Sequence, residues 1–103
     1  MPNRHRGETT ALLDGESRTL CLTLGALAEL EASLAAGDLM GLAKRFEEGR
    51  LTATDAIRII GAGLRGAGAD VSDEEVARMR AEGGAAGFVA IVADLLSATF
   101  GEG

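Results

Sequence analysis

The sequence predicts an α+β fold in which an N-terminal β-hairpin precedes a bundle of four to five short helices. One observation is an Asp14-Gly15 dipeptide between two segments that alternate in polarity. The other is that the segments after residue 23 carry apolar residues at helical spacing. A chain of 103 residues has room for one core, so we expect a single domain over residues 1–103.

The hairpin is expected within residues 8–24. Asp-Gly favours a type I′ turn, since both central positions take positive φ. This turn pairs Leu13 with Glu16 and Thr9 with Leu20. One face then carries Ala11, Leu13, Leu20 and Leu22, and the other carries Thr10, Thr19 and Cys21. Two strands alone are marginally stable, so helices must cover the apolar face.

Two helices are expected before residue 50. The first has Thr23 as N-cap, runs to about Ala36 and stops at Gly37, with a core stripe of Leu24, Leu27, Leu30 or Glu31, and Leu34. The second has Asp38 as N-cap and ends at Gly49, with a core stripe of Leu39, Leu42, Ala43 and Phe46.

Two further helices open with capping boxes. Thr52 and Asp55 start the third helix, which the glycines at 61, 63, 66 and 68 should end; its buried stripe is Ala53, Ile57, Ile60 and Leu64. Ser72 and Glu75 start the fourth, where Val71 can pack on Val76, and this helix is expected to last until residues 83–84.

The last helix is expected from about Ala85 to Thr99. It is apolar over most of its circumference, with Phe88, Val89, Ile91, Val92, Leu95, Leu96 and Phe100. Such a helix is either central in its fold or shared with a partner.

Charge and composition exclude several classes of function. With 16 acidic and 10 basic residues the net charge is −6, which repels a phosphate backbone and disfavours nucleic-acid binding. The basic cluster Arg4, His5 and Arg6 is interpreted as a solvated end of the chain. The most apolar stretch, residues 88–96, is about half the ~20 residues of a membrane span. No signal-peptide pattern is present, so we expect a cytoplasmic protein.

Side chains for catalysis or metal binding are scarce. The chain has one histidine, one cysteine and no Trp or Tyr, and a zinc site needs three or four ligands. Asp73, Glu74 and Glu75 stand in the first turn of a helix, where they complement its dipole. No nucleophile, base and orienting group can be assembled, so we expect no enzyme, no cofactor and no small-molecule substrate.

Gly61, Gly63 and Gly66 form a literal G-x-G-x-x-G pattern, which is typical of dinucleotide-binding loops. That mechanism requires the last glycine to open a helix, whereas another turn follows here. A helix that ends in a glycine-rich loop is the preferred interpretation.

Several blocks resemble the small tail-cluster protein of alphaproteobacterial gene transfer agents and related prophages. They are residues 4–8 (RHRGE), 20–31 (LCLTLGALAELE), 57–65 (IRIIGAGLR), 71–76 (VSDEEV) and 93–101 (ADLLSATFG). The resemblance covers nearly the whole chain. That family has been described both as a tail tube protein and as a tail assembly chaperone.

The resemblance implies a protein of a phage-like tail cluster, made beside the tape-measure and tail tube proteins. Tube subunits generally use broad β-sheets, and one hairpin argues for the chaperone. A chaperone would hold the tape-measure helix against an apolar surface, for which the candidate contact residues are Phe88, Ile91, Val92, Leu95 and Phe100.

Other functions remain open at this stage. A structural subunit would self-associate through the hairpin edge and stay in the finished particle. A regulator or toxin–antitoxin partner is a third class.

Overall fold

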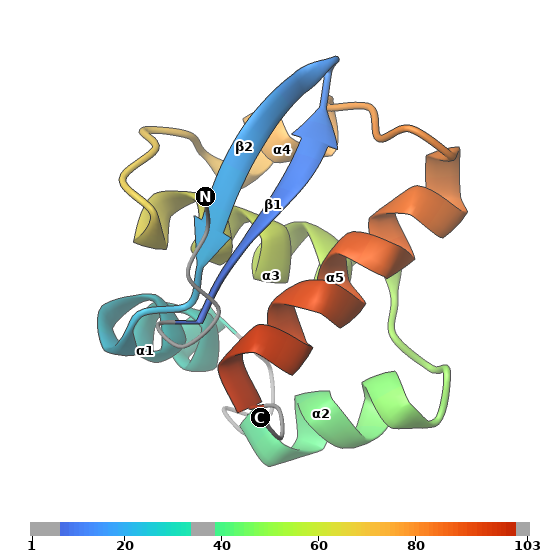
Figure 1. The fold of residues 1–103 in the computed structure, drawn as a ribbon. Coiled ribbons are helices and arrows are strands. Elements are labelled where there is room, and N and C mark those ends of the chain that lie inside the picture. The colour runs from blue at the N-terminus through green and yellow to red at the C-terminus, as the bar shows by residue number, and fades with distance from the viewer. Residues whose placement is uncertain (1–6, 34–38, 101–103) are drawn as a thin grey trace.

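The computed structural model describes residues 7–33 and 39–100. A hairpin of β1 (Glu8–Leu13) and β2 (Glu16–Cys21) is followed by α1 (Leu24–Ser33), α2 (Leu39–Glu47), α3 (Ala53–Gly66), α4 (Asp73–Ala77) and α5 (Gly84–Phe100). This confirms the predicted α+β fold (Figure 1). The predicted Arg4, His5 and Arg6 cluster, Leu34, the helix end at Ala36 and Gly37, and the N-cap Asp38 lie outside the described residues.

The hairpin has the predicted register. Leu13 pairs with Glu16 and Thr9 with Leu20, around a turn in which Asp14 and Gly15 have φ of 54° and 78°. The face that carries Leu13 and Leu20 is buried, together with Thr9, Ala11 and Leu22. The period-2 pattern therefore identified the core face of this ribbon correctly.

Helices α3 and α5 cover that face. In Figure 1, α3 crosses behind the hairpin and α5 runs beside β1, and the two helices also pack against each other. The core between them is aliphatic, as expected from a chain with few aromatic residues, and its fully buried side chains include Leu13, Leu20, Ile59, Leu64, Val92 and Leu95. The apolar last helix is thus central in the fold.

The prediction that glycines end α3 was wrong for Gly61 and Gly63, which lie inside the helix, whereas Gly66 is its last residue and Gly68, with φ of 100°, follows it. Gly63 and Gly66 are close-packing positions: a Cβ on Gly63 would lie 2.7 Å from Leu95 Cδ2, and one on Gly66 would collide with the carbonyl oxygen of Cys21. The G-x-G-x-x-G pattern therefore brings a helix against a strand and another helix, and forms no phosphate-binding loop.

The core stripe of α1 is rotated from the predicted one. Thr23 caps the helix as expected, accepting a 3.1 Å hydrogen bond from the Ala26 amide. However, Leu24 is 84% exposed, while Ala26 and Leu30 are buried. Ala26 packs beside Gly66, so the small residue faces α3 at the close approach. The spacing of the leucines alone does not indicate which face of α1 is buried.

Helix α4 is much shorter than predicted. Ser72 and Glu75 form the expected capping box, but the helix ends at Ala77. The chain then extends past the hairpin tip, where Ala81 bridges Leu13. The Arg78 and Met79 amides still donate to the Glu75 and Val76 carbonyls, but from Arg80 the backbone bonds to Asp14 at the hairpin tip and the helix does not continue. In the described part of the chain, none of the helices is long and apolar enough to cross a membrane.

Candidate functional site: an apolar groove between α3 and α5

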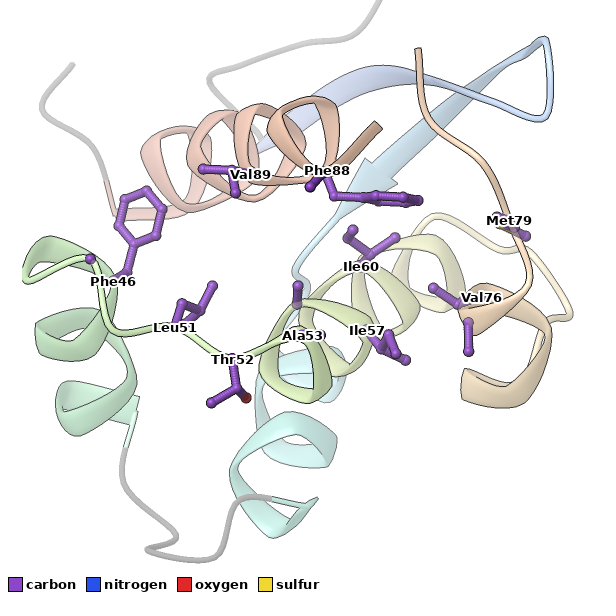
Figure 2. Close-up of a pocket in the computed structure, with 14 residues that line it drawn as sticks. Phe46, Leu51, Thr52, Ala53, Ile57, Ile60, Val76, Met79, Phe88 and Val89 are labelled. Atoms are coloured by element: carbon purple, nitrogen blue, oxygen red, sulfur yellow. The ribbon is translucent and has the colours of Figure 1, made fainter. Parts of the chain in front are cut away.

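A groove of about 470 Å³ opens between α3 and α5. Figure 2 shows Phe88 and Val89 of α5 on one side and Ala53, Ile57 and Ile60 of α3 on the other. Phe46 and Leu51 stand at one end of the groove, and Val76 and Met79 stand at the other. All of these lining side chains are apolar.

The α3 side of the groove depends on a capping box. The Asp55 amide donates to Thr52 Oγ1 at 3.1 Å, and the Thr52 amide donates to Asp55 Oδ2 at 3.2 Å. The helix therefore starts at a fixed residue, and Ala53, Ile57 and Ile60 follow at i, i+4 and i+7 on one face. Ile60 is buried, Ile57 is half-buried and Ala53 is exposed, so this face rises from the core to the surface.

The Asp55 carboxylate of the capping box also connects α3 to α2, at the end of the groove where Phe46 lies. Arg45 Nη2 lies 3.3 Å from Asp55 Oδ1, and the Asp55 side chain is only 10% exposed. Leu42 is buried on the same helix and Phe46 is half-buried against the core. The ion pair and the packing of Leu42 and Phe46 on the core place Phe46 at this end of the groove.

The α4 end is held by Arg65. Its Nε donates to Glu29 Oε1 at 2.8 Å, and its Nη1 donates to the Val71 carbonyl at 3.0 Å and lies 3.0 Å from Asp73 Oδ1. The hydrogen bond to Glu29 is the main reason that the pKa of Arg65 is raised above its ordinary value, and the guanidinium stays charged. Arg65 thus joins α1 and α3 to the start of α4.

The five candidate contact residues of α5 fall into two groups. Ile91, Val92 and Leu95 are 9%, 0% and 0% exposed. These three are core residues and are not available to a partner in this fold, which corrects their selection as surface contacts. Phe88 is half-buried and lines the groove, while Phe100 is 53% exposed outside its lining.

Most of the other residues that line the groove were predicted from the sequence to be core residues, or were given no role. Phe46 and Ile57 were assigned to buried faces, and Met79 was given no role. Periodicity identifies the apolar face of a helix but not whether a neighbour covers it. Among the lining residues, Val89 was the one most clearly indicated as a surface residue by the sequence. It makes the apolar part of α5 wider than a core-facing stripe requires, and in the structure its side chain is 57% exposed.

The site offers apolar contact and little chemistry. Thr52 is the polar lining residue, and its hydroxyl already accepts a hydrogen bond from Asp55. Cys21 lies elsewhere and is buried; desolvation, followed by the nearby charge of Glu8, raises the pKa of its thiol, so the reactive thiolate is disfavoured. Within the described residues no three His, Cys, Asp or Glu side chains gather where they could hold a metal ion.

Comparison with known proteins identifies the family. Residues 6–102 match the family described as "Phage tail tube protein, GTA-gp10". No curated protein and no solved structure matches the chain. The family match spans nearly the whole sequence and confirms the resemblance to gene transfer agent and phage tail-cluster proteins. The chain is therefore a member of this phage and gene transfer agent tail protein family.

Proposed function

We propose that the protein is a tail assembly chaperone whose apolar groove holds an amphipathic helix of the tape-measure protein until tail tube subunits assemble around it. The supporting observation is the groove itself, in which Val89 is 57% exposed beside half-buried Phe46 and Phe88. In this proposal the chain works by binding alone, in the cytoplasm of the bacterial host.

The surroundings of the groove favour a helix as its occupant. Its two long sides are the helices α3 and α5, whose backbone groups are already hydrogen-bonded within each helix. An extended strand would find no ladder partners there and would leave its own amides unpaired. A helix satisfies its own backbone and presents an apolar stripe, as in other helix-in-groove complexes. A specific small molecule would need convergent polar groups, which this lining does not provide.

A structural role in the tail is the second candidate, because the family description itself names a tail tube protein. Such a subunit would add to its neighbours through a hairpin edge and remain in the finished particle. Against it, the only strands in residues 7–33 and 39–100, apart from the Leu13–Ala81 bridge, are the two of the hairpin. A ring built from broad sheets would need more strands than this part of the chain supplies.

Val89→Glu tests the proposal. Its side chain is mostly exposed in the groove, so a charge there should leave the fold intact and abolish co-purification with the tape-measure protein. Leu24→Glu is the matched control, because Leu24 is 84% exposed and lies outside the groove. Both variants should melt within a few degrees of the parent. Equal retention of the tape-measure protein by the two variants would contradict the groove as the binding site.

The two candidate functions separate by the content of purified particles. The chaperone proposal expects the protein to co-purify with the tape-measure protein and to be absent from mature particles. Its presence in finished tails at the stoichiometry of a ring subunit would replace this proposal with the structural role.

A further inference from the structure

The α4 end of the groove is a short segment with little core of its own. It runs over residues 71–80 and supplies Val76, Ala77 and Met79 to the lining. Only five of its residues are helical, and Val76 is the buried residue of that helix. A helix this short is not stable by itself, so the position of this segment, here named the α4 wall, depends on the packing of Val76 on the core and on the contacts at its two ends.

Polar contacts hold the α4 wall at both ends. At its start Arg65 donates to the Val71 carbonyl and lies beside Asp73, each at 3.0 Å. At its end the Asp14 amide donates to the Arg80 carbonyl at 2.8 Å, and the Arg80 amide donates to Asp14 Oδ1 at 2.9 Å. The wall is thus fixed to α3 on one side and to the hairpin tip on the other, where the chain passes β1 and β2 in Figure 1.

We propose that Asp14 and Arg65 are positioning residues that set the place of the α4 wall and thereby the affinity of the groove for its helix. The inference rests on the proposed function. Neither residue lines the groove, so each acts through Val76 and Met79. When the α4 wall occupies its binding position for only a fraction of the time, the apparent affinity of the groove equals the intrinsic affinity multiplied by that fraction.

Asp14 is the better position for a test substitution than Arg65, because the turn does not need the Asp14 carboxylate. A type I′ turn requires positive φ at this position, which glycine and asparagine adopt readily, and Asp14 has φ of 54°. Asp14→Gly keeps the turn but removes the acceptor for the Arg80 amide. Asp14→Asn keeps both the turn and the Oδ1 acceptor, so it is the matched control.

Amide hydrogen exchange tests the structural half of the inference without any partner. Asp14→Gly should raise exchange in residues 76–81 about 3- to 10-fold, the effect of losing one ordinary hydrogen bond, while α5 keeps its protection. Asp14→Asn should exchange like the parent. Arg65→Lys, which cannot reach Glu29 and Val71 together, should raise exchange at the start of the wall. Unchanged exchange in both Asp14→Gly and Arg65→Lys would overturn the inference.

Retention of the tape-measure protein tests the functional half. Asp14→Gly should retain about 3- to 10-fold less of it, and Asp14→Asn should restore retention. Leu30→Val, a core change in α1 outside the groove, controls for lost stability and should keep full retention. Normal retention by Asp14→Gly would overturn the positioning role if Val89→Glu still fails to bind. If Val89→Glu binds as well, the proposed function falls, and the positioning role falls with it.

Discussion

Replacing Gly66 by alanine is expected to destabilise the protein by about 2–3 kcal/mol, the cost of overpacking a rigid contact. The new Cβ would collide with the carbonyl oxygen of Cys21 and lie 3.2 Å from Ala26 Cβ. Since both contacts are with backbone or with a short side chain, no rotamer change can relieve them. The midpoint of thermal unfolding should fall by roughly 10 °C or more, because 1 kcal/mol shifts a domain of this size by about 4–8 °C.

Gly25→Ala is the control for that experiment. Gly25 is also helical, but a Cβ there would meet only Thr23 Oγ1, at 3.9 Å. Alanine is favoured over glycine in helices by up to about 1 kcal/mol, so this variant should be neutral or more stable than the parent. A Gly66→Ala variant that also gains stability would show that α3 does not approach β2 as closely as described.

Replacing Leu95 by alanine should cost about 3–5 kcal/mol, as expected for a fully buried leucine. Its side chain lies beside Gly63, between α5 and α3, and because α3 also packs on the hairpin we expect little movement into the cavity. Against a total stability of about 5–15 kcal/mol, the loss removes a large share of the free energy of unfolding. Urea melts followed by circular dichroism measure it directly.

Phe100→Ala is the matched comparison on the same helix. Phe100 is 53% exposed, so its truncation should change stability by less than about 1 kcal/mol. If Leu95→Ala folded normally and lost only its partner, the core assignment of α5 would be wrong and the contact surface first inferred from the sequence would be restored.

The local signals in the sequence predicted local structure well. Asp14-Gly15 gave the hairpin register, and Ser72 with Glu75 gave the start of α4, because a turn or a cap is decided by a few neighbouring residues. The C-terminal end of α4 was missed because Arg80 bonds to Asp14, a residue 66 positions away in the chain. Sequence patterns do not report such tertiary contacts.

The candidate site was only partly predictable for the same reason. An apolar α5 indicated that the helix is central in the fold or shared with a partner. Val92 is buried in the core, while Val89 is exposed in the groove, where we propose that the partner binds. The glycines of α3 were interpreted as helix breakers, although packing against Cys21 and Leu95 explains them. The distinction between core and groove depends on which neighbour covers each face, and that is a property of the folded chain.

Site-specific photo-crosslinking from position 89 tests the central claim most directly. A benzoylphenylalanine in place of Val89, in cells that make the tail proteins, should crosslink to an amphipathic stretch of the tape-measure protein, and the same group in place of Leu24 should not. Mass spectrometry of the crosslinked peptide identifies the partner segment. Crosslinks from position 89 to tail tube subunits alone, or none from that position, would contradict the account of a groove that holds the tape-measure helix.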